Sequence, residues 1–418
     1  MRICAFILLF NCFVSFGQVI SLSGGSVLVR TGGSVAANLD TAQRGRSELF
    51  VDSERVSTLS GVSFSVNKPT KNAGNPIFGE SSDTWDFTKG GTTIIKDSDT
   101  EYRMWYSALI EGYDPPNTNQ DYACYATSSD AITWSKITIS LTNYLGNTTN
   151  NITVIDAPTP SVNNASVLIM EDGSFLLADF RGDVFTSANG TNWTYANDIQ
   201  PTGFSYLDFG YTDLVQMRDG TLRGYSQLYL DSKRQGGMAT ASAYSNTWTA
   251  YDGVLPGLEA STTSDQRYWT GVQENNGNWF AMINSFSESS QGGAVDLFFS
   301  RDGIRWSKVS DSWVPLGTGG DTVNIFSGKD LVRVGNNWNY YYAGTRDAHD
   351  SALFRRQLGA ASIGYQRIGQ VASEGTFTTQ KVKTTGQLII NADAEGGSVT
   401  AELIDMSNRQ VISGYAHE

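Results

Sequence analysis

Short runs of apolar and β-branched residues, separated by polar turn residues, follow one another along most of this chain. Residues 167–171 and 174–177 flank an Asp-Gly turn, and residues 331–334 and 338–342 flank Gly335–Asn337. Runs of this length, rich in Val, Ile, Tyr and Trp and bounded by Gly and Asn, predict β-hairpins. No stretch keeps the 3.6-residue apolar period of an amphipathic helix. The pattern therefore predicts an all-β protein.

One turn phrase recurs at near-constant spacing. Residues 299–306 read Phe-Ser-Arg-Asp-Gly-Ile-Arg-Trp, and related phrases end at Trp134, Trp193 and Trp248. From Trp134 to Trp306 the successive spacings are 59, 55 and 58 residues. Several short strands repeated at such a period indicate a β-propeller rather than a generic sandwich. A fifth unit falls near residue 363, where a small-residue strand without Trp occupies the same phase, so we predict five blades.

The two ends of the chain differ from this repeat. Residues 1–17 begin with Met-Arg and continue as a short apolar run ending in small residues, which is typical of a secretory signal peptide. Residues 18–46 form a Gly/Ser-rich leader or edge segment, and residues 47–370 hold the propeller. Residues 371–418 alternate as short strands, so we expect a small C-terminal β-module packed on the propeller. We therefore expect a secreted protein, extracellular or periplasmic, with no membrane attachment after cleavage.

The composition of the chain limits the kinds of ligand and partner that it can bind. Asp and Glu number 42 against 29 Lys and Arg, giving a net charge of −13, which argues against nucleic acid. Two of the three cysteines lie in the predicted signal peptide, so Cys124 has no intramolecular disulfide partner in a cleaved chain. No His/Cys cluster predicts a metal site; we expect no cofactor, although a structural Ca²⁺ on axial carboxylates stays open. Nothing in the sequence sets the oligomeric state.

The ordered motifs resemble a known group of proteins. Residues 49–52, 75–76, 102–106 and 300–306 carry the resemblance, together with later stretches at 340–344, 358–361 and 391–397. In this order they resemble secreted bacterial five-bladed propellers of the glycosyl hydrolase family 32-like or 43-like kind, over most of the chain after residue 48. The resemblance implies a five-bladed propeller strongly and a glycoside-cleaving reaction more weakly.

Glycoside hydrolysis needs two carboxyl groups flanking the scissile bond. An Asp stands 37 to 48 residues before each of the five repeat markers, and this set is Asp86, Asp156, Asp208, Asp265 and Asp321. We therefore expect the innermost strand of each blade to begin within a few residues of these acids, which would then face one axial funnel.

The resemblance assigns roles to three of these acids. It implies a base or nucleophile at Asp86, a supporting acid at Asp156 and the proton donor at Asp208. The last position departs from the family, which has Glu there, and Glu259, Asp213 and Asp265 are substitutes. We favour an inverting reaction, because acids spread around a five-fold axis leave room for water.

Further residues are candidates for substrate binding. Trp85 precedes the predicted base and could stack on a sugar ring, and Asp265 and Asp321 complete the set of acids. His349 and Arg346 follow the last predicted blade strand, where they could hold a hydroxyl or an anionic group.

We therefore predict a secreted glycoside hydrolase that acts on poly- or oligosaccharide through paired axial carboxylates. Two alternatives remain: a non-catalytic carbohydrate-binding propeller, or a polysaccharide lyase. In the lyase, His349 and a Tyr would abstract a proton beside a uronate carboxylate held by Arg346.

Overall fold

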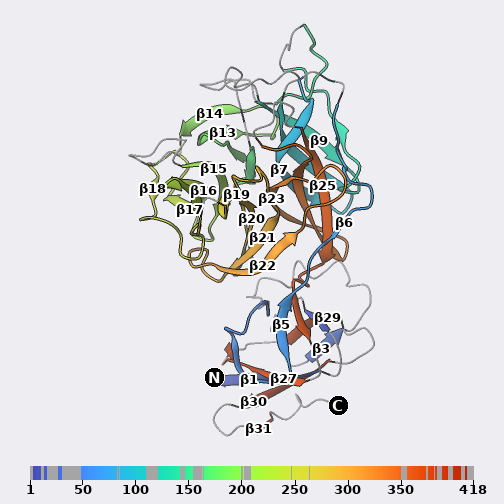
Figure 1. Cartoon of the computed structure of the whole chain (residues 1–418), viewed down its shortest axis with the longest axis vertical. Helices are drawn as coiled ribbons and strands as arrows, with labels where there is room; N and C mark the ends of the chain where they lie inside the picture. The colour runs from blue at the N-terminus through green and yellow to red at the C-terminus, as the bar shows by residue number, and fades with distance from the viewer. Residues whose placement is uncertain are drawn as a thin grey trace.

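The chain consists of a five-bladed β-propeller and a smaller two-sheet module, seen in a computed structural model (Figure 1). The structure describes residues 3–10, 14–16, 27–30, 49–81, 83, 85–109, 121–141, 146–153, 162, 164–198, 201, 209–245, 247–262, 264–349, 355–372, 375–380, 382–383, 388–393, 399–405 and 410–411. Every regular element over these ranges is a β-strand, so the predictions of an all-β class and of five blades are confirmed.

Each of the first four blades is a meander of four consecutive antiparallel strands, the first of them innermost. Blade one contains β7 (Thr88–Ser98), β8 (Glu101–Leu109), β9 (Asp121–Ser128) and β10 (Ser135–Lys136). Blade two contains β11 (Ser166–Ile169), β12 (Phe175–Ala178), β13 (Asp183–Ser187) and β14 (Thr194–Asp198). Blade three contains β15 (Phe209–Gln216), β16 (Leu222–Leu230), β17 (Lys233–Ala241) and β18 (Thr249–Ala250). Blade four contains β19 (Gln266–Asn275), β20 (Asn278–Phe286), β21 (Val295–Ser300) and β22 (Ser307–Val314).

Blade five is closed by a strand from the other end of the chain. It contains β23 (Asn324–Val334), β24 (Asn337–Thr345) and β25 (Arg356–Gly364), and its outermost strand is β6 (Thr70–Lys71). Lys71 stands opposite Ala361, and Thr70 opposite Ser362. This closure explains why the fifth repeat lacks its Trp: after β25 the chain leaves the propeller instead of turning back into a fourth strand.

The repeated turn phrase is held by the same hydrogen bonds in three blades. Ser128, Ser187 and Ser300 each accept the backbone N–H three residues later, at 2.8 to 2.9 Å. The Asp or Asn two residues after the Ser then accepts two further backbone N–H groups. The residue after this Asp or Asn has a positive φ, which is 62° at Ala131, 78° at Gly190 and 70° at Gly303, a conformation that Gly adopts freely. The recurring phrase therefore fixes the backbone conformation of the turn.

The apolar core of the propeller is divided among its five blade interfaces. One cluster of buried side chains lies between each pair of neighbouring blades, and the fifth joins blade five to blade one. Trp134, Trp193, Trp248 and Trp306 each bury their rings in one of these clusters. These repeat markers are therefore structural residues that pack between blade sheets.

A closed ring of hydrogen bonds joins the five innermost strands. In each blade a side-chain oxygen accepts a backbone N–H from the innermost strand of the next blade. The acceptor and donor pairs are Thr93 and Val167, Ser166 and Leu214, Asp213 and Val272, Gln273 and Leu331, and Asp330 and Ile94. On four of the innermost strands, the acceptor residue comes directly before the residue whose N–H donates to the preceding blade. In blade four the corresponding residue is Gly271, which has no side chain, and Gln273 supplies the acceptor oxygen instead.

The second module combines strands from both chain ends. One sheet contains β1 (Ile3–Phe10), β4 (Val56–Ser60), β27 (Gly375–Thr379), β28 (Val382–Lys383), β30 (Val399–Asp405) and β31 (Gln410–Val411). The other contains β2 (Val14–Phe16), β3 (Val27–Arg30), β5 (Ser63–Val66), β26 (Gly369–Ala372) and β29 (Leu388–Asp393). Both marked chain ends lie in this module (Figure 1).

The module packs on blades four and five. Leu49, Val51 and Ile368 join the apolar cluster of that blade interface. Trp313 donates its indole N–H to the Asn67 carbonyl at 2.8 Å, and Arg301 pairs with Asp52 at 2.9 Å. The predicted signal peptide covers β1 and β2, and its cleavage stays a prediction. Over the residues that the structure covers, no helix is long and apolar enough to span a membrane.

Candidate functional site

The innermost strands of the five blades begin at one face of the propeller, which we call the upper face. By their positions in the sequence, four of the predicted acids stand just before these strand starts. Asp86 stands two residues before β7, Asp208 directly before β15, Asp265 directly before β19 and Asp321 three residues before β23. Asp156 stands ten residues before β11, farther than predicted. Asp156 and Asp208 themselves lie outside the described residues.

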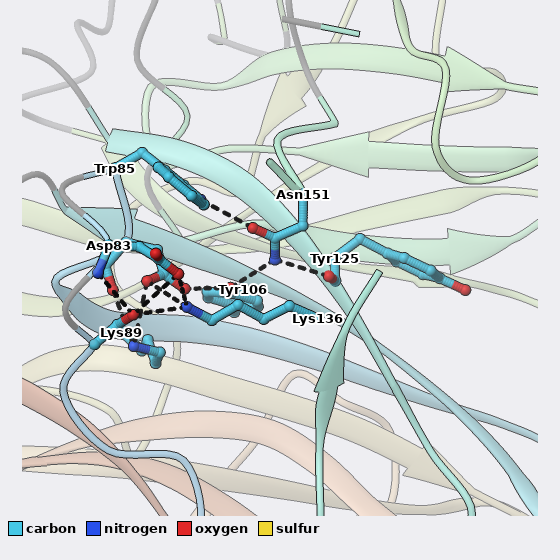
Figure 2. Close-up of polar contacts among 9 residues, drawn as sticks. Asp83, Trp85, Lys89, Tyr106, Tyr125, Lys136 and Asn151 are labelled. Atoms are coloured by element: carbon cyan, nitrogen blue, oxygen red, sulfur yellow. Dashed lines mark hydrogen bonds and ion pairs between the residues drawn. The ribbon is translucent and has the colours of Figure 1, made fainter. Parts of the chain in front are cut away.

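Asp86 lies at the centre of a buried ionic network, and its partners Lys89, Tyr106 and Lys136 are labelled in Figure 2. Its Oδ1 accepts a hydrogen bond from Lys136 Nζ at 2.8 Å and lies 3.7 Å from Lys89 Nζ. The Tyr106 hydroxyl donates to its Oδ2 at 2.7 Å. Lys136 belongs to β10, the outermost strand of the blade, so the Asp86 carboxylate points along its own blade and not at the axis. The side chain has no exposed area.

The two lysines complete this network differently. Lys136 also donates to Asp83 Oδ2 and to Ser81 Oγ, each at 2.8 Å. Lys89 is almost fully buried, donates to the Asp86 carbonyl at 2.9 Å and lies over the Phe78 ring. Burial lowers the pKa of Lys89 to about 8, although the nearby Asp86 carboxylate partly opposes this shift. Lys89 can therefore exchange a proton near neutral pH.

Trp85 is buried and does not offer a stacking face to solvent. Its indole N–H donates to Asn151 Oδ1 at 3.0 Å, while Asn151 donates to the Tyr106 hydroxyl at 2.8 Å and to the Tyr125 carbonyl (Figure 2). The ring lies among apolar side chains between blades five and one. The interpretation of Trp85 as a sugar-stacking residue is corrected accordingly: the indole anchors the Asp86 loop to the segment after blade one.

Asp121 is a second buried carboxyl at the upper end of blade one, and sequence reasoning missed it. Asp121 begins β9, the third strand of the blade, whereas the predicted acids stand before the innermost strands. Burial raises the pKa of Asp121 to about 6, against the opposing influence of Arg356 and Arg181. Arg356, also buried, reaches across β7 where Gly90 lacks a side chain: a Cβ there would lie 2.8 Å from the guanidinium.

His349 and Tyr268 form a direct pair between blades five and four. Tyr268 Oη lies 2.9 Å from His349 Nε2. Phe286 and Phe326 pack around the imidazole, and the Arg234 guanidinium lies 4.9 Å from the centre of the Tyr268 ring. Tyr268 is the third residue of β19, close to where that strand begins at the upper face. The pair unites a candidate base with a phenol, which the sequence alone could not place together.

The other predicted binding residues are dispersed over the upper face. Arg346 is half-exposed and pairs with Glu80 at 3.2 Å. Asp265 is ion-paired with Arg267, and its pKa is lowered by hydrogen bonds from Arg267 and Ser261 despite partial burial. Asp321 accepts hydrogen bonds from Lys71 of β6 and from Tyr342 of β24, so it points outward along blade five.

The expectation that the five acids face one axial funnel is therefore corrected. Asp86 and Asp321 are drawn to lysines on the outermost strands of their blades, because buried carboxylates require a charged or hydrogen-bonding partner. The innermost strands themselves carry the ring acceptors Asp213 and Asp330, and Lys329 beside Asp330 donates to Ser166 at 2.9 Å. Of the substitutes, Glu259 only caps the Gly257 N–H.

The described parts of the chain contain no group of three or more His, Cys, Asp or Glu that could hold a metal ion.

Solved structures show what this fold resembles. One similar structure belongs to a study of the GH130 family of mannoside phosphorylases, which contains glycoside hydrolases that target β-1,2 mannosidic linkages in Candida mannan. It has 13% identity and a TM-score of 0.54, and the match covers 74% of this chain and 96% of that one. A Bacteroides thetaiotaomicron protein described as a candidate glycosidase has 13% identity, coverage of 70% and 96%, and a TM-score of 0.52. A glycosyl hydrolase from Bacteroides ovatus has 14% identity, coverage of 74% and 97%, and a TM-score of 0.51.

No protein-family signature matches the chain, and no curated protein sequence is similar to it. At these identities the likeness establishes the fold: a five-bladed propeller of the kind found in glycoside hydrolases.

Proposed function

We propose that this protein is a glycoside hydrolase that cleaves poly- or oligosaccharide at the upper face of blade one. The observation that carries the proposal is Asp121, a buried carboxyl whose pKa is raised to about 6, in a fold that resembles glycoside hydrolases. Such enzymes need one carboxyl that holds a proton for the leaving oxygen and another that acts as base or nucleophile.

Asp121 is the proposed proton donor. A pKa of about 6 keeps a substantial fraction of the group protonated in mildly acidic medium, as a general acid requires. Arg356 and Arg181 lie near enough to influence this carboxyl, and their positive charges oppose the rise of its pKa. Asp208, which the resemblance implies as donor, stays a prediction.

Asp86, which the resemblance implies as base, stays a prediction that its surroundings do not favour. A base must touch water or the sugar, whereas the Asp86 carboxylate contacts Lys136, Lys89 and Tyr106 and has no exposed area. The proposal therefore also gives this carboxylate a structural duty, which is to join the start of β7 to β8 and β10. Inversion is proposed for the reaction, and it predicts that the first-formed product has the opposite anomeric configuration.

Variants of Asp121 test the proposed acid. Asp121→Asn should lower turnover of a natural polysaccharide by about 10²-fold or more, as loss of general acid catalysis does. It should retain most activity on a dinitrophenyl glycoside, whose leaving group needs no proton. For the wild type, kcat/KM should fall as pH rises through about 6, because the acid must be protonated.

Asp183→Asn is the matched control. Asp183 begins β13, the third strand of blade two, as Asp121 begins β9 in blade one, and it is also buried with a raised pKa. The control should leave both activities unchanged. Equal losses on the two kinds of substrate, or equal losses in the two variants, would remove Asp121 from the role of acid.

A polysaccharide lyase is the second candidate, favoured by the 2.9 Å contact between Tyr268 Oη and His349 Nε2. In that reaction the pair would take the proton beside a uronate carboxylate and return one to the leaving oxygen, forming a carbon–carbon double bond in the product. Tyr268→Phe should then abolish the appearance of an ultraviolet-absorbing unsaturated sugar from polygalacturonate. Wild-type protein that produces no such sugar from any uronate polymer would eliminate this candidate.

A further inference from the structure

A polar pocket of about 310 Å³ opens at the upper end of blade five, away from Asp86 and Asp121. Its walls are the segment that follows β6, the loop between β22 and β23, and the facing ends of β24 and β25. This volume is at the small end of the range for ligand pockets. Of the residues proposed to act in cleavage, Arg356 alone belongs to one of these segments, as the first residue of β25, and it does not line the pocket.

Two buried side chains anchor the pocket. Asp321 and Tyr342 are each more than nine-tenths buried, and the Tyr342 hydroxyl donates to Asp321 Oδ2 at 2.8 Å. Lys71 Nζ lies 2.5 Å from the same oxygen, and Asn75 donates to the Tyr342 hydroxyl at 3.1 Å. Within the described part of the chain, no group donates to Asp321 Oδ1. This oxygen and two of the three Lys71 protons are therefore available to a ligand.

Glycine backbone forms much of the remaining wall. A Cβ on Gly317 would lie 2.2 Å from Asp321 Oδ1, and one on Gly320 would lie 2.5 Å from Gln357 Oε1. These glycines let polar side chains lie flat against the loop. Gly319 also lines the pocket, but a Cβ there would meet no atom within 4 Å. The loop thus combines fixed polar groups with open space.

The charge of the pocket restricts its ligand. Lys71 and Asp321 neutralise each other, and Asn75 and Gln357 add only amide groups. A lone anion would meet the carboxylate, and a lone cation would meet the ammonium. A neutral polyol fits both, since one hydroxyl can donate to Asp321 Oδ1 while its neighbour accepts from Lys71 or from the Gln357 amide.

We infer that this pocket is an accessory binding site for one uncharged sugar unit of a glycan, which would hold the chain on the same face as the proposed cleavage site. The choice of a glycan as ligand rests on the proposed function; binding itself does not require cleavage.

Affinity electrophoresis of the full chain, run in the cold through gels containing mannan, arabinoxylan or polygalacturonate, tests the inference. Gly319→Val places a branched side chain in the open space, and Lys71→Met removes the ammonium. Lys96→Met is the matched control, because Lys96 is equally exposed and is also ion-paired with an Asp, at 2.7 Å. The wild type and the control should be retarded by a neutral polysaccharide. Both pocket variants should bind it at least tenfold more weakly. Gly319→Val should do so with an unchanged melting temperature, whereas Lys71→Met should also lose some stability because it leaves the buried Asp321 carboxylate without its ammonium partner.

Three results would overturn the inference: no neutral polysaccharide retards the wild type, the pocket variants are retarded normally, or polygalacturonate retards the wild type most. Cleavage of a dinitrophenyl glycoside, measured on the same proteins, separates this failure from that of the proposed function. If only the pocket inference is wrong, the wild type cleaves the glycoside and the pocket variants bind polysaccharide normally. If only the proposed function is wrong, the pocket variants lose binding but none of the proteins cleaves the glycoside.

Discussion

Each tryptophan that ends a repeat phrase contributes through its ring and not through its indole N–H. Trp306 is buried in the interface of blades three and four and packs edge-on against Tyr225, with ring centres 6.2 Å apart. In all four copies the buried indole nitrogen has no hydrogen-bond partner among the described residues. Ring volume therefore accounts for the recurrence of Trp at this position.

Two substitutions of Trp306 separate the contribution of its ring from that of its indole N–H. Trp306→Ala should cost about 3–5 kcal/mol of unfolding free energy, as large core truncations do. Trp306→Phe should cost much less, because it keeps an aromatic ring and removes an N–H that has no acceptor. Denaturant titration of both variants measures the difference. Equal costs would show that packing of the ring does not dominate.

At the scale of elements, the hydrogen-bond ring sets how neighbouring blades meet. Gln273 is its least regular member, since it replaces the acceptor that Gly271 lacks; it accepts the Leu331 N–H at 2.7 Å and donates to the Leu331 carbonyl at 3.3 Å. Gln273→Ala would leave a buried backbone donor unsatisfied, at a cost of about 1–3 kcal/mol. Gln370→Ala is a suitable control, since Gln370 accepts only an exposed bond from Ser65.

Chemical denaturation of the two glutamine variants compares them directly. A Gln273→Ala protein as stable as the Gln370→Ala control would mean that the ring does not contribute measurably to blade packing.

The first strand of the module bears on secretion, which stays a prediction. β1 reads Ile-Cys-Ala-Phe-Ile-Leu-Leu-Phe, so both of its faces are apolar, and it pairs with β27 and β30. This composition is typical of the apolar core of a signal peptide. Expression in a secreting bacterium, followed by N-terminal sequencing of the exported protein, should find a chain that begins after Gly17. Exported protein that still begins at residue 1 would contradict cleavage.

The sequence predicts blades well because their recurrence has a local cause. In each turn the Ser and the Asp or Asn accept backbone N–H groups from residues no more than three positions away, so the pattern is visible in one short window. Closure of blade five has no such window: two residues of β6 pair with β25, almost 300 positions away. Asp121 escaped notice for a related reason, since its environment comes from Arg356 and Arg181 in other blades.

At the scale of the molecule, several buried carboxyls should make stability depend on pH. Burial raises the pKa of Asp213 to about 7 and those of Asp330 and Asp121 to about 6, despite the opposing effect of Lys329 on the first two. Their usual value in an unfolded chain is 3.8. The folded protein therefore holds more protons between these limits, and its stability should fall as pH rises from about 4 to about 7.

Urea titrations across this pH range measure the effect. Asp213→Asn keeps an oxygen that can accept the Val272 N–H but cannot ionise, so its stability should fall less steeply over the same range. Unfolding free energies that stay level or rise between pH 4 and pH 7 would show that these carboxyls do not remain protonated in the folded protein.

The central claim, that the protein hydrolyses glycosidic bonds, is tested most directly by the products it forms in ¹⁸O-labelled water. The protein is incubated with mannan, arabinoxylan and polygalacturonate, and the products are analysed by mass spectrometry. The account predicts shortened chains that carry one ¹⁸O at the new reducing end, formed by the wild type and not by Asp121→Asn. Chains that stay intact, or unsaturated products without ¹⁸O, would contradict it.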